Sequence, residues 1–294
     1  MKKINSRQAR HSSKQTGFSY NKLILFLLSA LVIGVFLYRS FSYFNQVEIH
    51  TTSTTLKTGP GVEYKKVATL KKGTRLTVLK TQYHWYKVAT SQGKIGWVAD
   101  WALGTKKIKK ITDLSDATIV LDPGHGGNDS GALSNSGKEE KTYTLKYIKE
   151  LARKLRAKGT KVYLTRKTDT YVTLNARPAL AKKVHADAFI SIHFDSSPTP
   201  NEATGVTTYY YHKKISTSLA YYISNQFNSL GLTNRGTDFG NFLVLRDNTV
   251  PAVLLELGYI NSSQDFASIT STSYRNSATS DIVTGLSKYF AAKK

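Results

Sequence analysis

The chain has 294 residues, enough for about two domains, and 40% of them are hydrophobic, so most of it can bury a core. It contains no cysteine, which excludes disulfides, thiolate metal sites and cysteine nucleophiles and leaves His, Asp and Glu as metal ligands. The net charge of +23 favours polyanionic surroundings such as nucleic acid or anionic lipid. Because this charge is spread along the chain and no nucleic-acid-binding motif accompanies it, we expect no nucleic-acid partner.

The chain begins with a basic segment that is followed by an apolar one. Residues 1–22 carry six Lys or Arg and no acid, and residues 23–38 carry no charge. A helix over that apolar stretch would span about 24 Å, close to the ~30 Å of a bilayer interior. A cleaved secretory signal is the alternative, but the bulky sequence LYRSFSYF follows where a small-residue cleavage site is required. We therefore predict a basic cytoplasmic tail (1–22), a single-pass transmembrane anchor with its flank (23–44) and extracytoplasmic domains beyond it.

The segment after the anchor is rich in short β-type runs. Residues 46–104 contain KVATL, TRLTVLK, HWYKVAT and KIGWVAD, which are separated by TGPG, KKG and SQG turns. With its TGPG turn, its WYKV run and its GWV run, this segment resembles a bacterial SH3-type domain. The resemblance implies a small all-β barrel over residues 45–104, of a kind that often binds cell-wall material.

The aromatic residues of this barrel have two interpretations. Trp85 and Trp97 are each better explained as core residues than as a binding surface. If the barrel binds a ligand, exposed side chains such as Tyr64, Tyr83 or His84 are the better candidates.

Residues 105–116 (TKKIKKITDLSD) form a predicted basic linker, and a larger domain follows over residues 117–294. Apolar strand-like runs alternate there with helical patterns, which predicts an α/β domain with a mostly parallel twisted sheet and flanking helices. Helices are expected over residues 141–158, 174–187 and 277–294.

Three strand-like runs of this domain lead into a residue that can bind a metal or exchange a proton. TIVLD precedes His125, AFISI precedes His193 and AVLL precedes Glu256. Because sites in open α/β sheets lie beyond the carboxyl ends of the strands, these side chains should meet at one edge. Glu140 stands at the start of the helix predicted over 141–158 and adds a second carboxylate there. Two neutral imidazoles and one carboxylate suit zinc, with a fourth position open for water.

Each of these residues also has a purely structural interpretation. His125 can be an ordinary loop histidine, His193 a hydrogen-bonded core histidine, and Glu140 an acid that favours a helix start. Glu256 is harder to explain in this way, because a buried carboxylate needs a partner or a metal. HExxH and GxSxG are absent, and GHGG lacks the Lys-Ser/Thr of a phosphate loop, which disfavours these other site types.

The last domain resembles the zinc-dependent N-acetylmuramoyl-L-alanine amidases (amidase 3 type). It carries their motifs in order over about residues 117–290, among them IVLDPGHGGNDSGA, EEKTYTL, LNARPALAKKVHADAFISIH, NRGTDFGNFLVLR and VPAVLLELGYINSSQD. The resemblance implies zinc bound by three ligands, His125, Glu140 and His193, with Glu256 as the catalytic glutamate. It also implies a peptidoglycan hydrolase, an autolysin of a Gram-positive envelope, that cleaves the amide between N-acetylmuramic acid and L-alanine.

This chain departs from the family pattern after the second zinc histidine, where Phe194 and Asp195 replace the usual Ala and Asn. Asp195 adds negative charge near the metal, and with Asp122 it is a candidate to orient the metal ligands through hydrogen bonds. Two other functions stay open: a zinc peptidase that cuts within the stem peptide, and a non-catalytic wall-binding protein.

The expected partners follow from the anchor, the charge and the resemblance. Peptidoglycan is the expected substrate, and anionic wall polymers or lipids are expected to contact the basic surface. The anchor can also recruit a regulatory membrane protein. Few residues separate Arg39 from the first β-type residues near Val47, so the catalytic domain is expected to be held near the membrane. It should therefore act on glycan strands close to the membrane.

Overall fold

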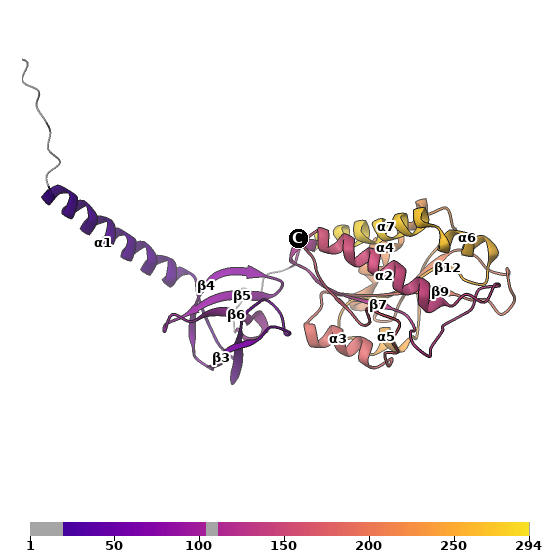
Figure 1. Cartoon of the computed structure of the whole chain (residues 1–294), viewed down its shortest axis with the longest axis horizontal. Helices are drawn as coiled ribbons and strands as arrows, with labels where there is room; N and C mark the ends of the chain where they lie inside the picture. Colours follow the sequence, from indigo (N-terminus) through magenta and orange to yellow (C-terminus); the bar gives the residue numbers. More distant parts are fainter. Residues whose placement is uncertain (1–19, 104–110, 294) are drawn as a thin grey trace, which may run out of the picture.

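The computed structural model describes residues 20–103 and 111–293, whose parts lie in a row: a long helix, a small β domain and a larger α/β domain (Figure 1). Most of the predicted tail (1–22) and residues 105–110 of the predicted linker lie outside the described residues. The predicted fold class is confirmed, with an apolar N-terminal helix, an all-β SH3-type region and a mostly parallel α/β domain.

Helix α1 (Tyr20–Phe44) has 25 residues, is exposed along its length and has a mean hydropathy of 2.2 over its most apolar window. By length and composition it can cross a membrane. A single residue, Asn45, separates it from the first strand. The Asn45 side-chain amide donates to the Phe41 carbonyl (3.0 Å), and the main-chain carbonyl of Asn45 accepts from the Val78 amide (2.8 Å). The helix therefore joins the β domain through a short, hydrogen-bonded connection.

The β domain is an antiparallel sheet in the order β1-β4-β5-β6-β2-β3. Its strands are β1 (Gln46–Glu48), β2 (Ser53–Lys57), β3 (Lys66–Lys71), β4 (Arg75–Gln82), β5 (Trp85–Thr90) and β6 (Ile95–Ala99), followed by the short 3-10 helix η1 (Asp100–Ala102). Its core includes the aliphatic residues Ile49, Leu56, Leu76, Val88 and Val98. Trp85 and Trp97 are buried, as predicted.

The α/β domain is built on a second sheet, in the order β11-β10-β12-β9-β7-β8. Its strands are β7 (Thr118–Pro123), β8 (Lys161–Leu164), β9 (Ala188–Asp195), β10 (Val206–Tyr210), β11 (Asn234–Phe239) and β12 (Ala252–Tyr259). Strands β8, β7, β9 and β12 are parallel, whereas β10 is antiparallel to β12. Every residue of β7 and β12 is buried, because helices cover both faces of the sheet.

Helices α2, α4 and α7 cover one face of this sheet, and α3 and α5 cover the other (Figure 1). The helices of the domain are η2 (Leu114–Asp116), α2 (Glu140–Ala157), α3 (Ala176–Val184), α4 (Lys213–Ser224), η3 (Phe227–Ser229), α5 (Leu243–Arg246), α6 (Ser263–Thr270) and α7 (Thr272–Ala291). Alternate residues of β9 face the two layers, with Ile190 in the core under α2 and Phe189 in the core under α3. Ile111 and Leu114, from the described end of the predicted linker, join the first of these cores.

Two predicted helices have different bounds in the structure. The stretch 174–187 is helical only over Ala176–Val184, because His185 adopts the left-handed conformation (φ 50°) that ends the helix. The last helix starts before residue 277, at Thr272, because Ser271 caps it by accepting a hydrogen bond from the Tyr274 amide.

Helices α4 and α7 are in close contact at Gly285, where an added Cβ would lie 2.6 Å from the Ile223 Cα. Gly285→Ala should therefore lower the free energy of unfolding by about 1–3 kcal/mol through overpacking, although alanine favours a helix. Thr284→Ala, at an exposed position of the same helix, is the control and should be neutral or slightly stabilising. Thermal melting followed by near-UV circular dichroism measures both, and an unchanged melting temperature for Gly285→Ala would contradict this packing.

Candidate metal and catalytic site

The structure brings the four predicted site residues to the carboxyl edge of the parallel strands. His125 follows β7, and His193 lies near the end of β9. Glu256 is the register partner of His193 on the neighbouring strand β12. Glu140 is the first residue of α2, the helix that follows the His125 loop. The convergence expected from the strand ends is therefore present.

The donor atoms of His125, Glu140 and His193 lie close enough together to share one metal ion. His125 Nε2 is 3.0 Å from Glu140 Oε2, and His193 Nδ1 is 3.0 Å from Glu140 Oε1. The two imidazole nitrogens are 3.1 Å apart. In a tetrahedral site with metal–ligand bonds of roughly 2.0–2.1 Å, neighbouring ligand atoms are about 3.3 Å apart. The spacing and the chemistry of these donors fit a tetrahedral metal site.

Backbone amides hold the buried Glu140 carboxylate in place. Its Oε2 accepts from the Ala132 amide (2.9 Å) and its Oε1 from the Phe194 amide (3.0 Å). Burial acts to raise the pKa of Glu140, but hydrogen bonds from His125 and His193 outweigh it and hold the pKa well below its usual range. The carboxylate is therefore ionised and supplies the negative charge that a cation at this position needs.

The glycine-rich loop after β7 orients His125 and gives it room. Asp129 Oδ1 lies 2.9 Å from His125 Nδ1, which leaves Nε2 to face the other two ligands. A Cβ on Gly124 would overlap the His193 ring, and a Cβ on Gly131 would lie 2.7 Å from His125 Cδ2. Only glycine permits the backbone to come this close to the two imidazoles.

Arg177, buried on α3, connects this loop to β7. Its Nη2 donates to the His125 carbonyl (3.0 Å) and its Nη1 to Asp122 Oδ1 (2.8 Å). Asp122 also accepts from the Thr165 hydroxyl (2.6 Å) and the Ser191 hydroxyl (2.8 Å). Asp122, predicted to orient a metal ligand, therefore reaches His125 through Arg177.

Glu256, the register partner of His193 on β12, is buried, and its Oε2 has no hydrogen-bond partner in the part of the chain that the structure describes. Burial raises the pKa of Glu256 well above its ordinary value, and the negative charges of Glu140 and Asp195 raise it further. A carboxyl group whose pKa is raised holds a proton more readily than an ordinary carboxyl group, which suits a residue that accepts and then returns a proton.

Each of the two domains matches a known protein family. The family described as N-acetylmuramoyl-L-alanine amidase matches residues 119–288, more than half of the chain, and the bacterial SH3 domain family matches residues 52–104. The chain belongs to the N-acetylmuramoyl-L-alanine amidase family.

Curated relatives match this amidase along most of its length. The probable cell wall amidase LytH of Staphylococcus saprophyticus is 39% identical over 303 aligned positions, which cover 99% of this chain and 100% of that protein. A protein of the same name from Staphylococcus aureus is 40% identical over 250 positions, 82% of this chain and 84% of its own.

Solved amidase structures match the α/β domain. The N-acetylmuramoyl-L-alanine amidase of Clostridium difficile 630 has a TM-score of 0.58 and 34% identity, covering 60% of this chain and 98% of that one. The catalytic domain of CwlV from Bacillus (Paenibacillus) polymyxa var. colistinus has a TM-score of 0.57 and 35% identity, covering 59% and 97%. The CwlD amidase of Clostridioides difficile, solved in complex with the GerS lipoprotein, has a TM-score of 0.57 and 26% identity, covering 60% and 99%.

Sequence reasoning missed three residues that support the site of this amidase, namely Asp129, Arg166 and Arg177. Arg166, also buried, donates through Nη2 to the Gly124 carbonyl (2.8 Å) and so fixes the start of the His125 loop. A signal existed for Asp129, which follows His125 by four positions in the same loop, and for Arg177, a lone charge in the apolar segment LNARPALA. Arg166 carried no comparable signal.

Asp195, which replaces the usual Asn, stands at the end of β9 and accepts a hydrogen bond from the Ser196 amide (2.7 Å). Its charge also acts on two neighbours: it raises the pKa of Glu256, and with burial as the larger cause it raises the pKa of Tyr259 to about 12. Asp195 therefore acts on the site electrostatically, by helping to raise the pKa of Glu256.

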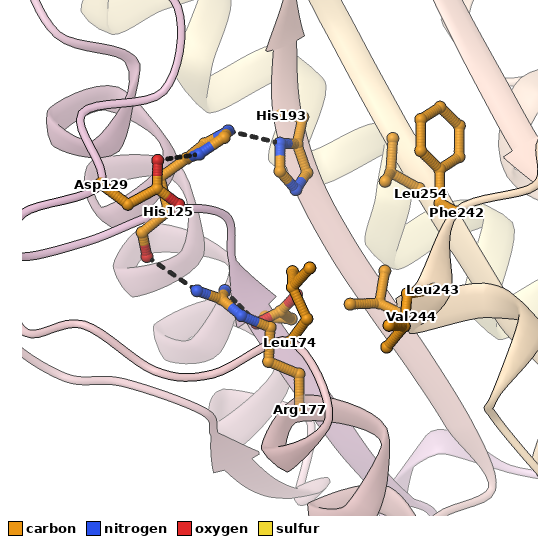
Figure 2. Close-up of a pocket in the computed structure, with 10 residues that line it drawn as sticks. His125, Asp129, Leu174, Arg177, His193, Phe242, Leu243, Val244 and Leu254 are labelled. Atoms are coloured by element: carbon orange, nitrogen blue, oxygen red, sulfur yellow. Dashed lines mark hydrogen bonds and ion pairs between the residues drawn. The ribbon is translucent and has the colours of Figure 1, made fainter.

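A cavity of about 160 Å³ opens beside the metal ligands. In Figure 2, His193 lies between His125 and Asp129 on one side and a group of apolar side chains on the other. The apolar residues that line the cavity are Leu174, Phe242, Leu243, Val244 and Leu254. They offer a small apolar group a place next to the candidate metal ligands His125 and His193.

Arg177→Met should lower the free energy of unfolding by about 3–5 kcal/mol, because the buried Asp122 carboxylate would lose its counter-ion. The double variant Arg177→Met/Asp122→Leu should recover part of this loss, since no charge would remain buried. Arg153→Met, which removes an exposed ion pair with Glu150 (2.7 Å), is the control and should cost at most about 1 kcal/mol. Thermal melting measures all three. Equal effects of the two single variants would contradict the stabilising role of the buried Arg177–Asp122 ion pair.

Proposed function

We propose that this chain is a zinc-dependent amidase that hydrolyses the bond between the lactyl group of N-acetylmuramic acid and the L-alanine of peptidoglycan. The observation that carries the proposal is the close set of donor atoms from His125, Glu140 and His193, with the buried Glu256 beside it. Membership of the amidase family and the printed names of the relatives support the reaction.

In this proposal His125, Glu140 and His193 hold the zinc ion. When bound, zinc supplies Lewis-acid chemistry, lowering the pKa of a water molecule toward ~7 and polarising the scissile carbonyl. The chain prepares the ligands for this in advance. Asp129 fixes the tautomer and orientation of His125, and two backbone amides fix the Glu140 carboxylate.

Glu256 is the proposed general base and general acid. Its carboxylate takes a proton from the attacking water and returns it to the nitrogen of the departing L-alanine. Its raised pKa favours holding the proton between these two steps. Asp195 contributes by adding negative charge next to Glu256.

We propose that α1 anchors the enzyme as a single-pass membrane protein with its domains outside the cytoplasm. The proposed parts are a cytoplasmic tail (1–22), the anchor with its flank (23–44), the SH3-type domain (45–104), a linker (105–116) and the catalytic domain (117–294). The length and apolarity of α1 and the names of the cell wall relatives support this arrangement.

Proposed partners follow from the same arrangement. Peptidoglycan is the substrate, and the net charge of +23 suits contact with anionic wall polymers or lipids. A regulatory membrane protein is a further proposed partner, since the structurally similar CwlD was solved in complex with a lipoprotein.

The deciding experiment incubates the full-length chain in detergent with defined peptidoglycan, in the presence of zinc or of a chelator, and identifies the products by mass spectrometry. An amidase releases intact stem peptides that begin with L-alanine and leaves bare glycan strands. Shortened stems would show a peptidase instead, and binding without release would show a wall-binding protein.

His125→Ala should reduce bound zinc from about one ion per chain to near zero and abolish hydrolysis, because two ligands hold zinc poorly. Metal analysis after dialysis measures the first effect and product release the second. His50→Ala, at an exposed histidine of the SH3-type domain, should change neither. Full zinc content in His125→Ala would remove this residue from the ligand set.

Glu256→Gln should keep the zinc content and lower turnover by a factor of about 10²–10⁴, because an amide cannot accept and return the proton. Glu202→Gln, at an exposed glutamate in the segment between β9 and β10, is the control and should keep normal turnover. Normal turnover in Glu256→Gln would show that another group acts as the base.

A further inference from the structure

The SH3-type domain contacts the catalytic domain through two residues of the turn between β4 and β5, Tyr83 and His84. His84 Nδ1 lies 2.6 Å from Asp100 Oδ2 in its own domain, and His84 Nε2 lies 2.7 Å from Asp187 Oδ1 in the catalytic domain. The Tyr83 hydroxyl donates to the Gly159 carbonyl (2.7 Å). Tyr83 and His84, named from the sequence as candidate binding residues if this domain binds a ligand, contact the catalytic domain.

Three further contacts of different kinds join the same two surfaces. Glu63 Oε1 lies 3.0 Å from Lys161 Nζ. The Trp101 and His185 rings stack at a centroid distance of 3.7 Å. Val62 packs against buried residues of both domains. The interface thus combines ion pairs, ring stacking and apolar contact, so its geometry depends on more than one exposed salt bridge.

The docked edge of the catalytic sheet is the one opposite to the metal site. Lys161 begins β8 and Asp187 directly precedes β9, so the contacts lie at the amino-terminal ends of the parallel strands. His193 lies at the other end of β9, about 17 Å from Ala188 along the strand. Helix α1 enters the SH3-type domain at β1, and the domain lies between the helix and the catalytic domain (Figure 1).

We propose that the SH3-type domain is a fixed spacer that holds the amino-terminal edge of the catalytic sheet toward the membrane and the metal-site edge away from it. His84 is the latch between the two domains. The site then faces polymer strands that pass above the lipid surface and not groups that lie in the surface itself. This inference rests on the proposed membrane anchoring and is independent of the proposed chemistry.

The charge of His84 suits this role. The titratable groups that face it are Asp100 from η1, Asp187 before β9 and His185 after α3. Burial acts to lower the pKa of His84, but hydrogen bonds to the two carboxylates outweigh it and raise the pKa to about 10. Because this value lies above the ordinary 6.5, the stabilisation is fully present below pH 6.5 and is lost as the pH rises through about 10. At neutral pH the latch is therefore charged and closed.

Because the chain has no cysteine, a single engineered cysteine can carry a fluorescent donor at a chosen edge. Two full-length proteins, Lys158→Cys at the docked edge and Glu202→Cys beyond the carboxyl end of β9, are placed in nanodiscs with acceptor-labelled lipid headgroups. Both positions are exposed. The Lys158 label should transfer energy at least about twice as efficiently as the Glu202 label. Equal efficiencies, or the reverse order, would overturn the spacer.

The latch is tested in the same two labelled proteins. His84→Gln with Glu63→Lys removes the charge on the latch and repels Lys161, so the difference between the two edges should shrink at least about twofold. The charge swap Glu63→Lys/Lys161→Glu, with His84 intact, is the control and should keep the difference. A full difference in the His84→Gln/Glu63→Lys protein would show that His84 is not the latch. Because no hydrolysis is measured, failure here is distinct from failure of the proposed reaction.

Discussion

Glu140 carries a negative charge into the interior of the catalytic domain, between His125 and His193. Two backbone amides and two imidazoles surround its carboxylate, and these partners offset the free energy that burying a lone charge would cost. The geometry of the site depends on this interaction, because the two oxygens of one carboxylate each contact one of the histidines. The start of α2, the loop after β7 and the end of β9 can meet only where these partners are all supplied.

Three further charged residues, Asp122, Arg166 and Arg177, are buried near the loop that carries His125. Arg177 and Arg166 donate to backbone carbonyls of the glycine-rich loop, and Asp122 neutralises Arg177 from within β7. A glycine-rich loop loses much conformational entropy on folding, so its ordered form needs such partners. The two arginines therefore help to hold the His125 backbone in one place.

The two ends of the parallel strands in the catalytic sheet have different roles. The carboxyl edge gathers the metal ligands and Glu256, whereas the amino-terminal edge contacts the SH3-type domain. The parallel strands β8, β7, β9 and β12 make this separation possible, because each presents the same end to the same side. A domain docked at one edge can then set the orientation of the other without blocking it.

The sequence predicted the fold class, the apolar helix and the SH3-type domain correctly, because hydrophobic period and turn residues are local signals. It also predicted correctly that Trp85 and Trp97 are buried. The roles of the four central site residues, which follow from strand ends and from the family resemblance, stay predictions. The tertiary structure decided the partners of those residues: Asp129 on His125, Arg177 on Asp122, and His84 across the domain boundary on Asp187. Residues distant in sequence make most of these contacts. The sequence could not show whether His84 is exposed, because its partner Asp187 lies on a separately folded domain.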